Sequence, residues 1–213
     1  MPQIREFRAS VEVEYITNQE NVLESRDFDQ TFSIDFQDGG VFWVTHRFRF
    51  ERLDEPFSIR PGQTIPVGDY WFREFNTNYS SDQSRMFSGS LFFQTGEFFD
   101  GHKNTARAGF GFKPSYHFGS SINWNREDVE LPSGDFTTHL VILRMNYSFN
   151  TRMFLNSLIQ YNNTVKEIAS NIRFNFIYKP LSDFFLVYNE RRASTGEVIE
   201  RALTAKLTYV FDF

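Results

Sequence analysis

Polar and apolar residues alternate along the N-terminal part of the chain. In residues 7–15 the odd positions are Phe, Ala, Val, Val and Tyr, and the even positions are polar or charged. This period of two predicts a β-strand with one apolar and one charged face. Residues 27–36 repeat the pattern in the opposite parity, and residues 42–50 repeat it again after the turn signal Asp38-Gly39-Gly40. We therefore predict three successive antiparallel strands in this region.

The turn at 38–40 also predicts a register for the second and third strands. The expected cross-strand pairs are Phe36 with Phe42, Ile34 with Val44, Phe28 with Phe50 and Asp29 with Arg49. In this register apolar side chains face apolar ones and a carboxylate faces a guanidinium, the pairs that stabilise a ladder.

The same alternation recurs to the end of the chain. Further strands are predicted at 106–112, 116–124, 141–149, 153–161, 172–178, 184–188 and 203–213, with two less regular ones at 70–80 and 85–95. The total is about twelve strands, most of them about as long as the ~9–11 residues that a tilted strand needs to cross a bilayer. No segment has a helical period.

The connections between the predicted strands alternate in length. Short turns are expected at 38–40, 80–84, 113–115, 150–152 and 179–183, and longer polar loops at 17–26, 51–69, 96–104, 125–135, 162–167 and 189–199. Aromatic residues gather near both strand ends. Phe36, Phe42, Phe112, Tyr116, Phe149, Tyr178 and Phe213 lie near the short turns, and Tyr15, Phe50, Trp124, Tyr161 and Tyr188 near the long loops. Alternating loop lengths and two aromatic girdles are typical of outer-membrane barrels.

We therefore predict an all-β, antiparallel, up-and-down transmembrane β-barrel of about twelve strands, with residues 1–213 forming a single domain. The alternative is a soluble β-sandwich or ligand-binding barrel, in which the apolar faces would form an interior. A barrel in lipid explains the composition better. The chain has 27 Phe among its 213 residues, and the alternation places most of them on an outer surface.

Composition and charge exclude several other classes. The chain has no cysteine and a net charge of −5, which excludes a disulfide framework and a thiolate metal site. No basic run is present, so no nucleic-acid partner is expected. No stretch of about 18 apolar residues predicts a transmembrane helix. The first residues show no signal-peptide pattern.

The C-terminal residues resemble the recognition signal of bacterial outer-membrane proteins. This assembly signal comprises Leu207, Tyr209, Phe211 and Phe213, and the resemblance implies that the barrel assembly machinery reads it. Over nearly its whole length the chain is also similar to the C-terminal part of an uncharacterised outer-membrane barrel family. The motifs that carry this similarity are Glu55-Pro56-Phe57, Ile65-Pro66-Val67-Gly68-Asp69-Tyr70, Phe98-Phe99-Asp100-Gly101, Leu131-Pro132-Ser133-Gly134-Asp135-Phe136-Thr137-Thr138, Leu158-Ile159-Gln160-Tyr161-Asn162 and Phe185-Leu186-Val187-Tyr188-Asn189.

Full-length members of that family carry an N-terminal module similar to family-9 carbohydrate-binding domains. The resemblance thus implies that this chain is the C-terminal part of a larger barrel, with a complete twelve-stranded barrel as the other possibility. It also implies a bacterial outer-membrane location, contact with outer-membrane lipid and a link to carbohydrate through that module. It brings no catalytic residue and no cofactor.

Candidate chemistry is sparse. His46, His102, His117 and His139 are scattered, without the spacing of metal ligands. His117 shares a predicted face with Ser115 and Ser121, which leaves an outer-membrane hydrolase with Ser and His at the lumen edge as an alternative. The preferred prediction is a non-catalytic pore or membrane anchor.

Charged residues on the predicted inner faces are candidates for lining a lumen. They are Arg47, Arg49, Arg107, Arg144, Arg173, Lys206, Glu12, Glu14, Asp29 and Asp35. One hypothesis is that their uneven distribution guides anionic or sugar-like solutes. The other, which we favour, is that they pair across the ladder and keep the interior hydrated and rigid.

Overall fold

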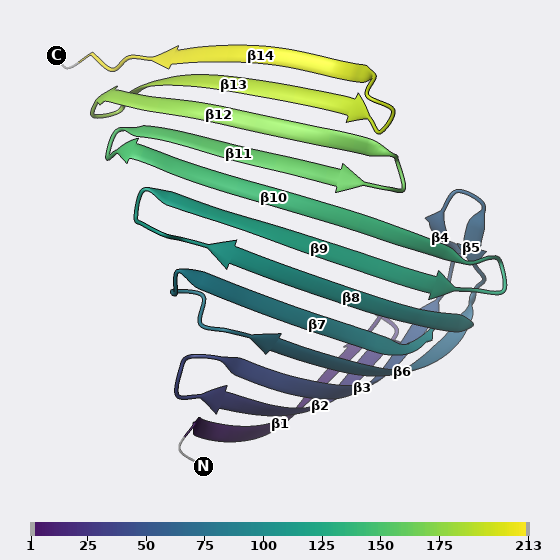
Figure 1. Ribbon diagram of the computed structural model, residues 1–213. Coiled ribbons are helices and arrows are strands. Elements are labelled where there is room, and N and C mark those ends of the chain that lie inside the picture. The colour runs from purple at the N-terminus through teal and green to yellow at the C-terminus, as the bar shows by residue number, and fades with distance from the viewer. Residues whose placement is uncertain (1–2, 212–213) are drawn as a thin grey trace. The chain divides into compact units, whose positions relative to one another are not determined.

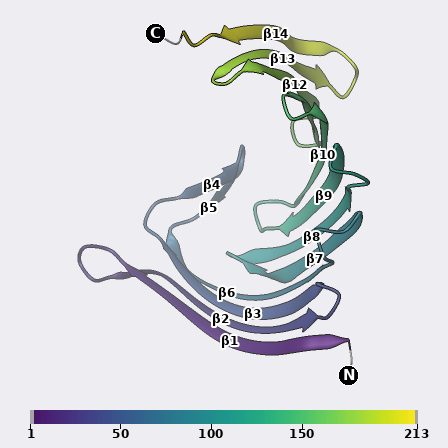
Figure 2. The same cartoon turned by 90° about the vertical axis from the view of Figure 1, so that its left-hand side faces the viewer.

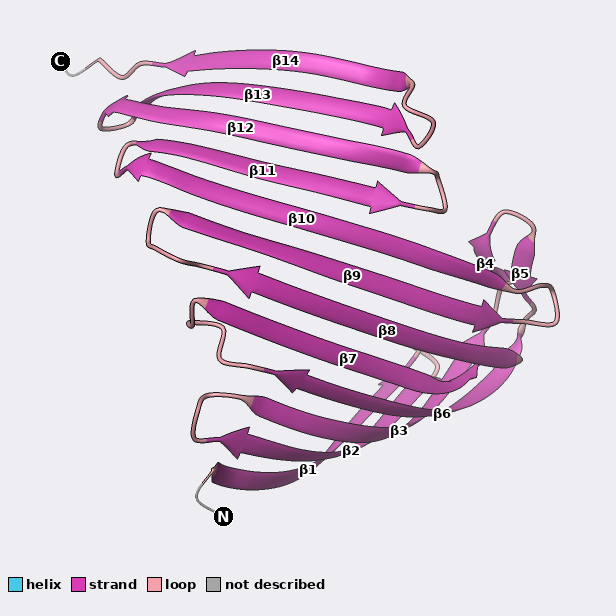
Figure 3. Ribbon diagram, in the orientation of Figure 1, coloured by secondary structure: helices cyan, strands magenta, loops and turns pink. Residues whose placement is uncertain are grey.

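The computed structural model describes residues 3–211, and every regular element in this part of the chain is a β-strand (Figures 1 and 3). The strands are β1 (Ile4–Thr17), β2 (Leu23–Phe36), β3 (Val41–Leu53), β4 (Phe57–Arg60), β5 (Gln63–Ile65), β6 (Gly68–Ser80), β7 (Phe87–Phe98), β8 (Gly101–Phe112), β9 (Phe118–Glu130), β10 (Phe136–Asn150), β11 (Met153–Asn162), β12 (Glu167–Lys179), β13 (Ser182–Ala193) and β14 (Val198–Thr208). Within residues 3–211 no helix is long and apolar enough to cross a membrane.

Twelve of these strands form one sheet with up-and-down topology. Its order is β1-β2-β3-β6-β7-β8-β9-β10-β11-β12-β13-β14, and β4 and β5 form a separate two-stranded sheet. The pairs whose registers are known are all antiparallel. This confirms the predicted fold class at the level of an all-β antiparallel sheet of twelve strands.

The predicted register of the β2–β3 hairpin is wrong by two residues. Ile34 faces Phe42, and Asp29 faces Arg47 instead of Arg49. The reason is the turn, in which the Phe36 N–H donates to the Gly40 carbonyl at 2.8 Å and Gly39 has a φ of 86°. This three-residue loop is centred one position earlier than the sequence suggested. A shift of two residues keeps every side chain on its predicted face.

The predicted alternation of loop lengths is also wrong. β7 and β8 are joined by Phe99 and Asp100 alone, where a long loop at 96–104 was expected. The connections at 18–22, 131–135, 163–166 and 194–197 are short too, and the connection at 81–86 on the other side is no shorter. The strands continue past the points where alternation fades, because ladder hydrogen bonds join backbone groups whatever the side chains. Only 54–67 is long, and it contains β4 and β5.

The last strand begins earlier than predicted and ends earlier. β14 covers Val198–Thr208, whereas 203–213 was expected. Beyond its end the Val210 N–H donates to the Ser182 hydroxyl at 3.0 Å, so a side chain replaces the ladder there.

The chain divides into two compact units. The first unit comprises Met1–Asp82, Ser90–Ala108 and Arg126–Thr137, and the second comprises Gln83–Gly89, Gly109–Asn125 and Thr138–Phe213. The first contains β1 to β6, and Figure 2 shows the β4–β5 hairpin standing off its β1-β2-β3-β6 portion. The second contains β11 to β14.

A small apolar core holds the β4–β5 hairpin in the first unit. Ile65, Val129 and Leu131 are buried at its centre. The partly buried side chains around them are Leu53, Ile59, Tyr70, Phe98, Phe99 and Phe136. The sequence pattern predicted a plain loop here.

Candidate functional site: the two faces of the strands

Strand β6 shows how the first unit distributes its side chains. Trp71 and Phe75 are 59% and 44% exposed, whereas Glu74 and Asn76 between and beside them are 4% and 6% exposed. The face that carries Trp71 and Phe75 is called here the apolar face, and the face that carries Glu74 the polar face. On this strand Trp71 and Phe75 are exposed, whereas the opposite face buries a carboxylate together with Phe72, which is 4% exposed. Exposed rings beside a buried carboxylate are the reverse of a soluble protein.

The inversion extends across both units. Large exposed apolar side chains on the apolar faces include Phe7, Val11, Val13, Phe32, Phe75, Leu91 and Phe93 in the first unit and Phe110, Ile122, Tyr147, Leu203 and Leu207 in the second. The buried polar residues are Asp35, Thr45, Gln63, Glu74, Asn76, Ser88, Thr105 and Ser182, against buried apolar Phe50, Ile65, Phe72, Val129 and Leu131. Among the described residues, polar side chains are therefore buried at least as often as apolar ones.

Aromatic rings cluster where strands meet the turns at 37–40, 81–86, 113–117, 151–152 and 180–181. The ring centroids of Phe36 and Tyr79 are 6.4 Å apart in the first unit, and those of Phe87 and Phe112 are 5.1 Å apart in the second. Tyr209 stacks on Tyr178 at 6.4 Å. Such rings are favoured at the boundary between apolar and wet surroundings.

Three residues of the predicted assembly signal lie in the described part. Leu207, Tyr209 and Phe211 are all exposed, and the fourth, Phe213, lies outside the described residues.

Four charged candidates of the first unit are paired on the polar face, two with each other and two with residues outside the predicted set. Arg47 binds Asp29 through two contacts, including Nε to Oδ1 at 2.7 Å. Arg49 binds Asp27 through two contacts of 2.9 Å. Buried Asp35 accepts from Arg5 at 3.1 Å and from Arg8 at 2.9 Å. These contacts support the pairing hypothesis for Arg47, Arg49, Asp29 and Asp35.

The two remaining acidic candidates lie beside this network. Glu12 faces Asp29 and Glu14 faces Asp27 across the β1–β2 ladder. Carboxylates directly opposite each other are destabilising, so Arg47 and Arg49 on the next strand offset this repulsion. Arg107, also in the first unit, lies 4.7 Å from the Phe92 ring centroid.

The basic candidates of the second unit are different. Arg144 faces Leu158, Arg173 faces Asn156 and Val187, and Lys206 faces Phe185. Within residues 3–211 none of the three cations makes an ion pair, and all three are exposed. The pairing hypothesis therefore fails for this group, and the structure does not bring the ten candidates together in one cluster.

The histidines make structural contacts. His117 Nδ1 lies 2.6 Å from the Ser148 carbonyl oxygen, and the Ser115 hydroxyl accepts from the His117 backbone N–H at 3.2 Å. The imidazole is thus bonded to backbone and not to Ser115. His46 lies on the apolar face, opposite Gln30 and 4.4 Å from the Phe48 ring centroid. Within residues 3–211 no group of three or more His, Asp or Glu could hold a metal ion.

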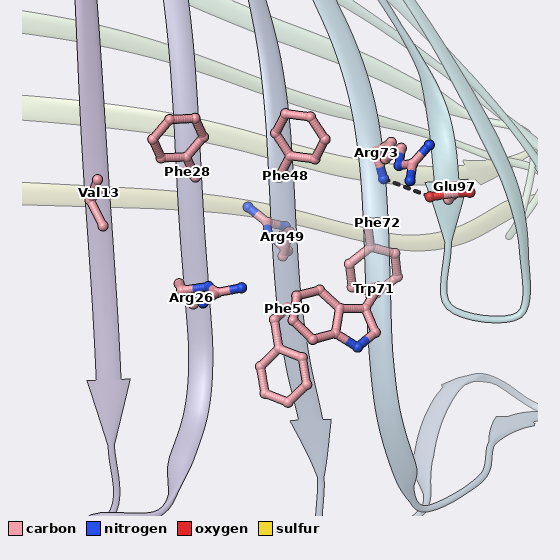
Figure 4. A pocket seen from close by; sticks show the side chains of 10 residues that line it. All are labelled: Val13, Arg26, Phe28, Phe48, Arg49, Phe50, Trp71, Phe72, Arg73 and Glu97. Atoms are coloured by element: carbon pink, nitrogen blue, oxygen red, sulfur yellow. Dashed lines mark hydrogen bonds between the residues drawn. The ribbon is translucent and has the colours of Figure 1, made fainter.

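A pocket of about 730 Å³ opens in the first unit and was not predicted (Figure 4). Most of its lining comes from the apolar face, yet Arg26 and Arg73 are among the lining residues. The only signal for it in the sequence is the break in alternation at these two positions.

Comparisons of the chain with protein-family models, with curated proteins and with solved structures give no match. The similarity to the barrel family, and the sugar-binding module that it implies, therefore stay predictions. What the chain does has to be inferred from the geometry of its two faces.

Proposed function

We propose that this chain is a non-catalytic, membrane-spanning β-barrel domain of a bacterial outer membrane and acts as a pore or membrane anchor. The observation that carries the proposal is the inversion on strands such as β6, with Trp71 and Phe75 exposed and Glu74 and Asn76 buried. Exposed apolar surface is unfavourable in water by roughly 25 cal/mol per Å². In lipid the same face is favourable, and the strands pair their backbone groups with one another.

The length of the apolar face fits this role. On β1 the apolar positions run from Phe7 to Tyr15, which at about 3.3 Å per residue is roughly 26 Å along the strand. A tilt of about 40° reduces this to about 20 Å, close to the ~25 Å apolar band of outer-membrane barrels. The aromatic pairs beside the turns, such as Phe36 with Tyr79, match the expected interfacial girdle.

The polar faces favour a pore over a simple anchor. Paired residues such as Arg47 and Asp29 would stiffen the wall, whereas Arg144, Arg173 and Lys206 offer unpaired positive charge. Unpaired cations in a pore attract anionic solutes. A link to carbohydrate is supported by the family resemblance alone, and belongs to the proposal as a module that this domain would anchor.

The requirement for detergent tests the membrane proposal. The purified chain is expected to stay dispersed only in detergent or lipid, and to run at a different gel mobility before and after boiling. A monodisperse, detergent-free monomer with native β-structure would contradict the proposal. β1 and β14 are the two ends of the strand order. Strands at the edge of a sheet can pair with other chains and aggregate, so folding should be assayed in liposomes as well as in micelles.

A further inference from the structure

Two arginines interrupt the apolar face of the first unit. Arg26 on β2 lies in register with Phe50 on β3, which in turn faces Trp71 on β6. Arg73 on β6 faces Phe48. Arg26 lies near the start of β2, next to the connection at 18–22, and Arg73 lies near the middle of β6.

Neither guanidinium is neutralised by a carboxylate within residues 3–211. Arg26 lies 5.3 Å from the Trp71 ring centroid, a cation–π contact. Glu97 also lines the pocket between these strands, and its carboxylate accepts from the Arg73 backbone N–H at 2.8 Å. Two guanidiniums, Arg26 and Arg73, against the one carboxylate of Glu97 leave a net positive charge on this face for an external anion.

Several arginines elsewhere on the strands are paired. Arg52 binds Asp69 at 2.7 Å in the first unit. In the second unit Arg192 and Arg201 both bind Glu190, at 2.9 and 2.6 Å. Arg26 and Arg73 differ from these arginines.

The pocket around the two arginines has apolar walls. Val13, Phe28, Phe48, Phe50 and Trp71 line it, and Figure 4 shows Arg26 and Trp71 extending toward each other above β3. Trp71 and Phe50 are in ring contact at 4.7 Å. At about 730 Å³ the pocket is of the size that takes a small ligand.

We propose that this pocket binds an anionic lipid, with the Arg26 and Arg73 guanidiniums on its phosphate and the aromatic walls against its acyl chains. Guanidinium groups bind phosphate in bidentate fashion, and aromatic rings favour the level of the lipid head groups. The apolar walls favour a lipid over free phosphate, because only a lipid has acyl chains that can pack against them. The inference rests on the proposed membrane location of this face.

Quenching of Trp71 fluorescence by brominated lipids tests the proposal. Trp43→Phe and Trp124→Phe leave Trp71 as the only tryptophan. The chain is folded into bilayers with the same minor fraction of either brominated phosphatidylglycerol or brominated phosphatidylcholine. Two charge-assisted contacts should enrich the anionic lipid near Trp71 about tenfold. With Trp124 as the only tryptophan, the two lipids should quench equally.

Arg26→Gln with Arg73→Gln should abolish the preference at Trp71. The matched control is Arg152→Gln with Lys166→Gln, which removes the same charge from two exposed turn residues and should leave the preference intact. If the double variant does not fold, Arg26→Gln alone should weaken the preference at Trp71.

Three results would overturn the proposal or its basis. Equal quenching of Trp71 by both lipids means that the pocket does not select an anionic head group. Persistence of the preference in Arg26→Gln with Arg73→Gln means that the two guanidiniums do not bind the head group. Quenching of neither tryptophan by any brominated lipid means that the apolar face does not contact lipid, and this result alone refutes the proposed function.

Discussion

The Arg47 guanidinium on β3 binds the Asp29 carboxylate on β2 through two hydrogen bonds. Nε lies 2.7 Å from Oδ1, and Nη2 makes the second contact. The two residues are direct partners across the ladder. Glu12 faces Asp29 from β1, so Arg47 neutralises one of two carboxylates that lie opposite each other. This ion pair depends on the register of the β2–β3 hairpin, and it neutralises charge on the polar face.

Arg47→Ala should lower the free energy of unfolding by about 2 kcal/mol, because the Asp29 side chain, 14% exposed, loses a charge-assisted partner. Denaturant unfolding in micelles measures this loss. In a double-mutant cycle, Asp29→Asn should restore part of the stability of Arg47→Ala. Strictly additive effects would show that the contact is not energetically coupled.

Gly96→Ala should be the most harmful glycine substitution on β7. A Cβ at Gly96 would lie 2.3 Å from the Arg73 carbonyl oxygen, whereas one at Gly89 on the same strand meets nothing closer than 3.8 Å. Such overpacking costs about 1–3 kcal/mol. Unfolding in micelles should thus separate the two variants, and equal stability of Gly96→Ala and Gly89→Ala would contradict the close approach of β6 and β7.

Ile65→Ala should loosen the β4–β5 hairpin. Ile65 is 1% exposed at the centre of its core, so the truncation should cost about 2–4 kcal/mol. Hydrogen exchange should rise in residues 57–65 while the twelve-stranded sheet stays protected. Val67→Ala, at an exposed position, is the control and should change little. Unchanged exchange in Ile65→Ala would mean that this core does not hold the hairpin.

Arg144→Gln with Arg173→Gln should reduce anion preference in planar bilayers, because both cations are exposed on the polar face and make no ion pair within residues 3–211. The reversal potential in a salt gradient measures it. Arg152→Gln with Lys166→Gln serves again as the control of equal charge. Unchanged selectivity with normal conductance would remove the role in guiding solutes, and absence of any conductance would favour a membrane anchor.

The faces of the strands could be predicted from the sequence, but the register could not. Alternation at 7–15 and 27–36 fixes which side chains share a face. It leaves open a slip of two residues, since Asp27 and Asp29 repeat at the spacing of Arg47 and Arg49. The turn determines the register. Its geometry at Gly39 depends on hydrogen bonds that the pattern of polar and apolar residues does not show.

The candidate site was harder to predict from the sequence than the fold. The β4–β5 hairpin has strands of four and three residues, too short for a periodic signal. In the sequence, Arg26 and Arg73 are only breaks in the alternation of polar and apolar residues. Their cross-strand neighbours, such as Phe50 and Trp71, come from distant parts of the sequence. Whether a charged residue is paired, as Arg49 is, or unpaired, as Arg144 is, depends on the same long-range register.

A nitroxide scan along β6 tests the central claim most directly. The chain has no cysteine, so single substitutions from Trp71→Cys to Thr77→Cys give one label each in protein folded into liposomes. We predict that accessibility to oxygen, which concentrates in lipid, peaks at positions 71, 73, 75 and 77 and falls at the buried positions 72, 74 and 76. Oxygen maxima at the even positions, or no period of two, would contradict a lipid-facing apolar surface.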